Sequence, residues 1–310
     1  MAGRLSRNAS SAYDTGVMRN FAALAASVML TPSLGHTAPI AAAVAQEGVT
    51  ITEAGRPVFF YRTRPAPGAE PGRSNYLHPV YAPDGRVLTE ERPADHLHQR
   101  GVFWSWHQVA VGGRQAADGW FMQNLTFPVR RTKFEPQPDG SGVLEVEVDW
   151  RVAGADEPAT AAREITRVTA HPLKNGRRRL DFDTTITAVS DGFSLGGSND
   201  VKGYGGFSVR FVRPDRLEFT SEGAPVQPQN TAVAAGRVMT FTWPSARDLP
   251  PYRAVLSCEA NGEPITRWIL RRELSMQNCV FPGRAPYEIS KGQSLRLRSS
   301  LLIEPSETAP

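Results

Sequence analysis

Apolar and polar residues alternate with a period of two along most of the chain after residue 46. In an extended strand such alternation turns one set of side chains towards a core and the other towards solvent, so each run predicts a half-buried β-strand. The clearest runs are residues 144–150, 180–186, 207–211, 239–243 and 295–303.

Turn-forming residues separate these runs, at 83–85, 138–140, 174–176, 261–262 and 282–283. The chain has 27 glycines and 25 prolines among its 310 residues, without a collagen-like period. We expect one short helix, around residues 159–165. Many short strands joined by hairpin turns predict an all-β fold, a large antiparallel β-sandwich. Residues 46–310 show neither an internal repeat nor a linker and are predicted to form one domain.

Residues 1–45 have the pattern of a secretory signal peptide with an N-terminal extension. A short basic region begins at Met18, about ten apolar residues follow from Phe21, and a small-x-small sequence ends at Ala45. The apolar run is shorter than the roughly 20 residues that span a bilayer. We expect cleavage after Ala45, with Met18 as the true start. An N-terminal anchor or a disordered tail is the alternative.

Cleavage there predicts an exported protein, periplasmic or extracellular, with no membrane span in the mature chain. Two cysteines, Cys258 and Cys279, could pair in such an oxidising compartment, and two buried reduced thiols are the alternative. The formal charge is only +4, from 35 basic and 31 acidic residues spread along the chain. A nucleic-acid partner is therefore not expected, because it would need clustered positive charge.

Candidate chemistry is concentrated between residues 75 and 107, which hold four of the six histidines. On an extended chain His96, His98 and Arg100 project from one face. Two imidazoles at positions i and i+2 can bind one metal ion or hold one ligand, and a structural role is the alternative. A metal would need a third ligand. The candidates for it are His78, His107 and Asp95.

Two tryptophans follow the histidine pair. Trp104 and Trp106 share the parity of His96 and His98, so a straight strand would place their indole rings beside the imidazoles. His107 has the opposite parity, unless a β-bulge at Gly101 shifts the register. Flat aromatic faces stack on pyranose rings, while Arg and His bind hydroxyl or carboxylate groups. This wall is therefore expected to suit a sugar.

Two further segments are weaker candidates. Residues 196–206 are glycine-rich and place Asp200 two positions before Lys202. This is not a phosphate-binding P-loop, because the Gly-Lys-Ser/Thr order is missing, and a hairpin with a surface ion pair is the alternative. Arg271 ends a Trp-Ile-Leu-Arg sequence that is also typical of a core strand.

These motifs resemble those of the PmoA-like domain of unknown function, DUF6807. The resemblance covers about residues 50–305 and rests on the segments 78–85, 95–104, 200–206 and 268–271. Leu97, Gln99 and Ile269 stand where the family usually has proline, histidine and histidine, which weakens a shared metal site more than a sugar site. The resemblance implies an exported β-sandwich associated with carbohydrate utilisation. The family's methane-oxygenase label does not transfer, because such a subunit needs membrane-spanning helices.

We therefore expect an exported carbohydrate-active enzyme of hydrolase, lyase or epimerase type, with mutarotase-like supersandwich enzymes as a fold-level analogy. A histidine would act as general acid or base, and Asp95 would orient an imidazole. The alternatives are a non-catalytic glycan-binding module and a metal-dependent oxidoreductase. The sequence identifies no cofactor, sugar or oligomeric state. Expected catalytic residues are His96, His98, Asp95 and His107; expected substrate-binding residues are His78, Arg100, Trp104, Trp106, Asp200, Lys202 and Arg271.

Overall fold

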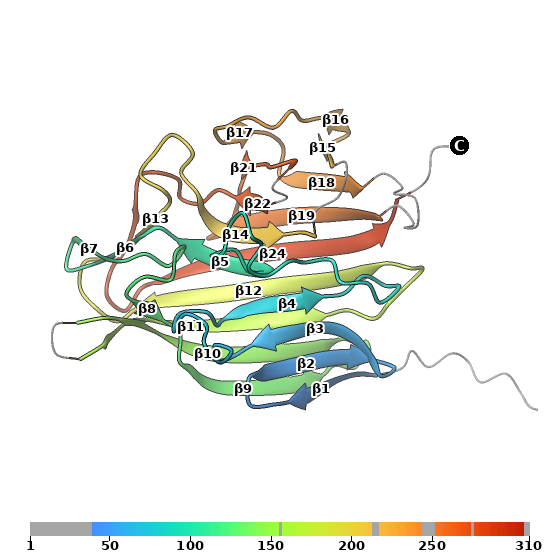
Figure 1. The fold of residues 1–310 in the computed structure, drawn as a ribbon, viewed down its shortest axis with the longest axis horizontal. Coiled ribbons are helices and arrows are strands. Elements are labelled where there is room, and N and C mark those ends of the chain that lie inside the picture. Colours follow the sequence, from blue (N-terminus) through green and yellow to red (C-terminus); the bar gives the residue numbers. More distant parts are fainter. Residues whose placement is uncertain (1–38, 155–156, 213–216, 244–251, 274–275, 307–310) are drawn as a thin grey trace, which may run out of the picture. The chain divides into compact units, whose positions relative to one another are not determined.

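A computed structural model describes residues 39–154, 157–212, 217–243, 252–273 and 276–306. In these residues every regular element is a β-strand, and the strands pair antiparallel in two large sheets and one small sheet (Figure 1). The predicted all-β antiparallel fold is confirmed. Among the described residues, no helix is long and apolar enough to cross a membrane.

The first large sheet has nine strands and carries the candidate chemistry. In spatial order it consists of β1 (Ile40–Val44), β2 (Gly48–Glu53), β3 (Arg56–Arg62), β4 (Tyr76–Val80), β5 (Val102–Trp106), β14 (Gly205–Arg210), β22 (Met276–Cys279), β21 (Arg267–Ile269) and β17 (Val233–Ala234).

The second large sheet has eleven strands and includes the longest ones. Its main path consists of β16 (Ala224–Pro225), β15 (Glu218–Ser221), β18 (Val238–Trp243), β19 (Tyr252–Ala260), β24 (Ser294–Pro305), β12 (Arg178–Ala188), β11 (Ala159–Ala170), β10 (Gly142–Val152) and β8 (Leu125–Thr126). Beside this path β20 (Glu263–Pro264) pairs with β19, and β9 (Val129–Pro136) pairs with β10.

A small sheet of four strands completes the fold. It consists of β23 (Tyr287–Ile289), β13 (Phe193–Gly196), β6 (Gln108–Val111) and β7 (Arg114–Ala117). The five alternating runs of the sequence lie in β10, β12, β14, β18 and β24, as predicted. The predicted turn at Asn261-Gly262 joins β19 to β20. Both residues have positive φ angles, 52° and 87°, which a two-residue hairpin of type I′ requires.

The predicted helix at 159–165 is wrong, because these residues begin strand β11. That strand pairs with β10 on one side and β12 on the other. Within it Ala162 and Glu164 are buried, while Arg163 and Ile165 are exposed, which is the alternation of a strand. Pairing on both edges overrides the weak helical preference of the local sequence.

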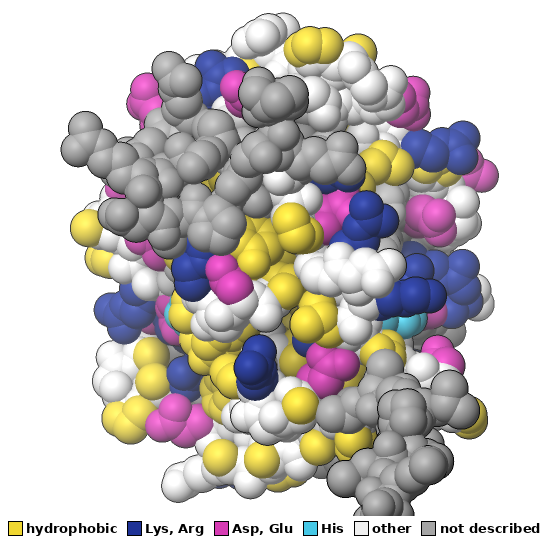
Figure 2. Space-filling model, turned by 90° about the vertical axis from the view of Figure 1, so that its right-hand side faces the viewer, with side chains coloured by type: hydrophobic (Ala, Val, Ile, Leu, Met, Phe, Trp, Pro, Cys, Tyr) yellow, Lys and Arg dark blue, Asp and Glu magenta, His cyan; other side chains and the backbone are white. Residues whose placement is uncertain are grey.

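The two large sheets pack face to face around one apolar core. The rings of Trp104 and Phe182 lie 6.4 Å apart and those of Trp106 and Trp150 lie 5.8 Å apart, and each pair joins β5 to the eleven-stranded sheet. On the face seen in Figure 2, basic and acidic side chains are interspersed around apolar ones.

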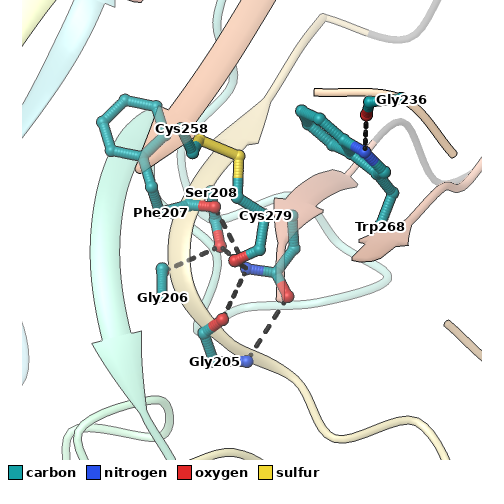
Figure 3. Close-up of a disulfide and its surroundings, with 9 residues drawn as sticks. Gly205, Gly206, Phe207, Ser208, Gly236, Cys258, Trp268 and Cys279 are labelled. Carbon is teal, nitrogen blue, oxygen red and sulfur yellow. Dashed lines mark hydrogen bonds between the residues drawn. A yellow bond between two sulfur atoms is a disulfide. The ribbon is translucent and has the colours of Figure 1, made fainter. Parts of the chain in front are cut away.

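A disulfide between Cys258 and Cys279 joins the two large sheets (Figure 3). Cys258 lies in β19 and Cys279 in β22, and both are buried. The sequence left pairing and free thiols open, and the structure shows the pair. A cross-link closing a loop of 21 residues is worth on the order of 3 kcal/mol.

Part of the predicted signal segment forms a strand. Residues 40–44 make up β1, which pairs with β2 along its whole length, and the side chain of Ile40 is buried in the core. Cleavage after Ala45 stays a prediction, and it would remove β1 from the sheet. The predicted basic region and apolar run lie outside the described residues.

Candidate functional site

A pocket of about 340 Å³ lies on the face of the nine-stranded sheet that points away from the main core. Beside it a second apolar cluster includes Phe103 of β5, Met276 of β22 and Trp120. All three candidate segments of the sequence contribute to the pocket wall. The lining residues are His96, His98, Gln99, His107, Trp120, Phe121, Ser198, Asp200, Lys202, Tyr204, Arg271 and Met276.

Strand pairing explains why distant segments meet there. Trp106 at the end of β5 pairs with Gly205 at the start of β14. His107 follows Trp106 and Tyr204 precedes Gly205, so these two residues lie near each other. Their rings lie 6.4 Å apart. Met276 begins β22, the next strand of the sheet, and Arg271 lies on the segment that leads into it.

His107 is held by a carboxylate on one side and an aromatic ring on another. Its Nδ1 lies 3.0 Å from Oδ2 of Asp118, and its ring stacks on Trp120 at 5.3 Å. Trp120 in turn stacks on Tyr204 at 5.6 Å. Among the described residues Nε2 of His107 has no hydrogen-bond partner, so it is the nitrogen available to a ligand. A carboxylate at Nδ1 fixes the tautomer and the orientation of an imidazole.

His96 has the same kind of partner. Its Nδ1 lies 3.1 Å from Oδ2 of Asp95, and Asp95 accepts hydrogen bonds from Arg210 at 3.0 and 3.3 Å. Burial raises the pKa of Asp95, but the His96 hydrogen bond and the Arg210 charge outweigh it and hold the pKa below the ordinary value. The structure therefore places Asp95 where an orienting carboxylate must lie.

His98 lies near both His96 and the aromatic wall. Its ring centre is 5.6 Å from that of His96 and 4.8 Å from that of Phe121. Burial, followed by electrostatic interactions with His96 and Arg100, lowers the pKa of His98 to about 4. His98 is therefore a neutral imidazole at pH 7, able to accept a proton or a hydrogen bond.

The low pKa of His98 predicts how stability depends on pH. The unfolded chain, with a pKa of 6.5, binds the proton more readily than the native protein, with a pKa of about 4. Stability from this group is therefore complete above pH 6.5 and decreases as the pH falls from 6.5 towards 4. We expect the wild type to lose more stability than His98→Gln between neutral pH and pH 5, measured by denaturant unfolding. Equal losses in the two proteins would contradict this assignment.

Arg100 does not line the pocket, contrary to expectation. Its side chain is 1% exposed and its guanidinium lies over the ring of Phe103 at 4.7 Å. It donates to the carbonyl oxygens of Gly119 and Trp120 at 3.3 and 3.5 Å. The role that this geometry supports is to hold the loop that carries Trp120, rather than to bind a ligand.

Trp104 and Trp106 do not lie beside the histidines, so that expectation is wrong. Both side chains point into the core between the sheets and are 3% and 0% exposed. The expected parity does not hold, because residues 94–98 form turns rather than an extended strand. His107, by contrast, reaches the pocket because it shares the parity of Phe103, on the other face of β5.

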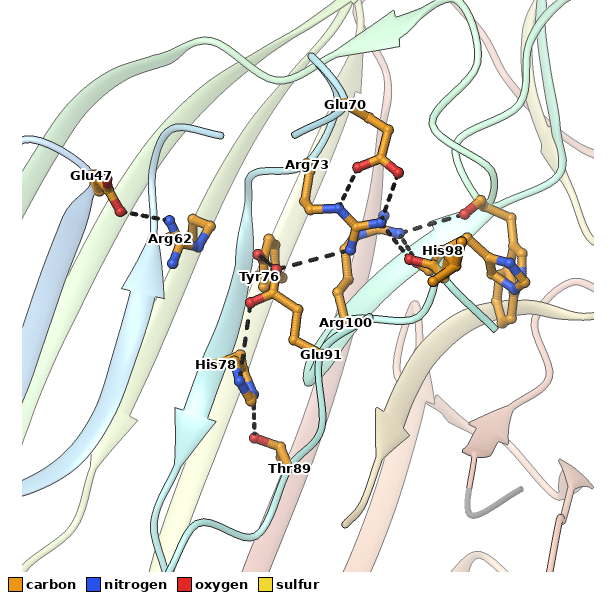
Figure 4. A network of polar contacts seen from close by, with 12 residues as sticks. Glu47, Arg62, Glu70, Arg73, Tyr76, His78, Thr89, Glu91, His98 and Arg100 are labelled. Atoms are coloured by element: carbon orange, nitrogen blue, oxygen red, sulfur yellow. Dashed lines mark hydrogen bonds and ion pairs between the residues drawn. The ribbon is translucent and has the colours of Figure 1, made fainter. Parts of the chain in front are cut away.

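His78 lies on β4 and is absent from the pocket lining (Figure 4). Its Nδ1 is 3.0 Å from Oγ1 of Thr89, and its Nε2 is 4.0 Å from Glu91. Burial lowers the pKa of His78. Glu91 also accepts a hydrogen bond from Tyr76, so His78 belongs to a polar network beside the pocket rather than to its wall.

Asp200 lines the pocket but is engaged in its own turn. Its Oδ1 accepts hydrogen bonds from Oγ of Ser198 at 2.7 Å and from the backbone N–H groups of Lys202 and Gly203 at 2.9 and 3.2 Å. These bonds shape the loop that presents Lys202. Lys202 and Arg271 both line the pocket, as the sequence suggested for ligand-binding residues.

Several residues of the site were not predicted from the sequence. Trp120 and Phe121 of the lining, and Asp118 behind His107, come from a short segment after β7, and Tyr204 comes from the glycine-rich segment. The only local signal was an Asp-Gly turn followed by two aromatic residues. This local sequence does not predict which histidine these residues will contact.

The histidines do not form a metal site in the part of the chain that the structure describes. There, no three His, Cys, Asp or Glu side chains are grouped so that they could hold one metal ion. The third ligand that the metal hypothesis required is thus not supplied by His78, His107 or Asp95.

Fold and site together define an antiparallel β-sandwich protein with a histidine-lined pocket on the outer face of one sheet. Within that class, the chain belongs to the family of unknown function DUF6807, whose model matches residues 48–310. The resemblance drawn from the histidine motifs is confirmed. The comparison with curated proteins found no match.

Proposed function

We propose that the protein is an exported carbohydrate-active enzyme in which paired histidines transfer protons to and from a sugar. The observation that carries this proposal is that two imidazoles, His96 and His107, face one pocket and each has an aspartate at Nδ1. An imidazole held in this way acts as a general acid or base near neutral pH.

The shape and composition of the wall suit a sugar ring. Tyr204 is half-buried and packs on Trp120, which is itself 3% exposed, and Phe121 remains 45% exposed beside them. Leu97 and Val201, next in sequence to lining residues, are 55% and 71% exposed. Apolar surface left in solvent around a polar pocket is typical of a ligand site.

Among the reaction types, elimination or epimerisation fits these residues better than hydrolysis. Most glycoside hydrolases place two carboxyl groups about 5 to 9.5 Å apart across the bond they cleave. Asp200 is the one carboxylate among the described lining residues, and its Oδ1 is engaged in the turn. Histidines that remove and return a proton are what an epimerase or a lyase requires.

Export is part of the proposal and rests on two features. The N-terminal sequence has the pattern of a signal peptide. The Cys258–Cys279 disulfide is of the kind that persists in oxidising compartments and is rare in the cytosol.

The test is to incubate the protein with a panel of oligosaccharides and to analyse products by mass spectrometry for cleavage and by proton NMR for an epimer, whose mass is unchanged. We expect products without added water, because elimination and epimerisation, unlike hydrolysis, do not incorporate it. The variant His107→Gln should abolish them. His171→Gln is the matched control, since His171 also pairs with an aspartate, Asp181, but does not line the pocket. Binding without any product would indicate a glycan-binding module, and no binding to any saccharide would contradict the proposal.

A further inference from the structure

Two cationic side chains lie over one aromatic ring in the pocket. The Nζ of Lys202 is 5.6 Å from the ring centre of Tyr204, and the guanidinium carbon of Arg271 is 5.7 Å from it. Arg271 also donates a hydrogen bond to the Tyr204 hydroxyl at 2.9 Å. Two positive charges therefore lie over the Tyr204 ring, at one end of the pocket.

Neither cation forms an ion pair within the described part of the chain. Both terminal nitrogens of Arg271 donate to uncharged oxygens, among them the carbonyls of Gln229 and Leu270 at 2.8 and 2.9 Å. Arg271 is therefore a fixed positive charge, and the three N–H groups of Lys202 remain for a ligand.

The carboxylates near the pocket form no ion pair with either cation in the described part of the chain. Asp95 lies behind His96 and is paired with Arg210, and Asp118 lies behind His107. Asp200, on the lining, accepts hydrogen bonds at Oδ1 from Ser198 and from backbone N–H groups, and it keeps its negative charge two residues from Lys202.

We propose that the pocket takes an acidic sugar, a uronic acid, whose carboxylate binds Lys202 Nζ beside the fixed charge of Arg271. This inference rests on the proposed function and names the substrate class for the same site. An aromatic ring flanked by two cations without ion-pair partners matches a sugar ring that carries one negative group. A bound carboxylate also makes the adjacent ring C–H more acidic, which is what a histidine base in the same pocket needs.

The experiment compares each acidic glycan with its own uncharged form. Polygalacturonate, alginate and hyaluronan are titrated against the protein by calorimetry at physiological salt, alongside their methyl esters, in which the ring is unchanged and the charge is removed. We expect at least one free acid to bind and its ester to bind about 10- to 100-fold more weakly, the effect of losing one hydrogen bond to a charged group.

Lys202→Met should weaken binding of the acid to the same extent and leave binding of the ester unchanged. Lys174→Met is the matched control, because Lys174 is exposed and lies in a turn before β12. If Lys174→Met binds the acid with unchanged affinity, the loss in Lys202→Met reflects a local contact and not a general attraction of the acid to a basic protein.

The remaining outcomes overturn the inference in distinguishable ways. If neutral glycans bind as well as acidic ones, the acidic-sugar assignment fails while the sugar pocket stands. If sulfated glycans bind and carboxylated ones do not, the anionic group is wrong. If no saccharide binds at all, the proposed function fails as well.

Discussion

Replacing Glu164 with glutamine is expected to lower the free energy of unfolding by about 2 to 4 kcal/mol, because buried donors would lose their acceptor. Glu164 is 1% exposed, within the core of the sandwich. Its oxygens accept hydrogen bonds from Asn75 at 3.0 and 3.1 Å, from Trp150 at 2.8 Å and from Thr166 at 2.7 Å. The NH₂ group of a glutamine would face at least one of these donors and could not accept its hydrogen bond.

The hydrogen-bond network around Glu164 cannot easily rearrange to accommodate glutamine. The Oδ1 of Asn75 already accepts a hydrogen bond from Tyr61, so its amide group cannot flip without loss. Burial raises the pKa of Glu164, and hydrogen bonds from its donors partly offset this. The matched control is Glu147→Gln on the exposed face of β10, where we expect little change. Chemical denaturation gives both values, and an unchanged midpoint for Glu164→Gln would contradict the network.

Replacing Asp118 with asparagine is expected to reduce turnover about 10²- to 10⁴-fold, the usual contribution of general acid–base catalysis, on the saccharide that the panel identifies. Asp118 accepts from His107 Nδ1 through Oδ2 and from the backbone N–H of Phe121 through Oδ1. An asparagine amide at Oδ2 would donate instead of accepting, and would leave His107 in the wrong tautomer.

A merely structural role for Asp118 would give a different result. Positioning of His107 predicts a large decrease in kcat, a smaller change in KM and an altered pH profile, with partial recovery in Asp118→Glu. Asp181→Asn is the control, because Asp181 pairs with His171 outside the pocket. If Asp118→Asn and Asp181→Asn retain equal activity, His107 is not the acid or base.

The part of the fold that could be predicted consists of the strands in which apolar and polar residues alternate. In β10 and β12 one face is apolar and the other charged, so the period of two identified strand and buried face together. In β11 the same reasoning failed, because Glu164 is buried and Ile165 is exposed. A carboxylate enters a core only when several donors surround it, and two of the three donors to Glu164, Trp150 and Asn75, come from other parts of the chain.

The candidate site, like the fold, could be predicted from the sequence only in part. His96, His98 and His107 were found from their density in the sequence, and Lys202 and Arg271 from weaker signals. Their convergence depends on β5, β14 and β22 being neighbours in one sheet, although β14 follows β5 by about a hundred residues and β22 follows it by more.

The sequence by itself determined the all-β class, most long strands, the family and the segments that carry the chemistry. These follow from local periodicity and from residue types at fixed spacing. Only the tertiary structure decided that Trp104 and Trp106 belong to the core, that Asp118 and Trp120 complete the site, and that the cysteines pair. The physical reason is that β5 is buried on both faces, and a strand with two apolar faces carries no pattern that distinguishes the core side from the pocket side.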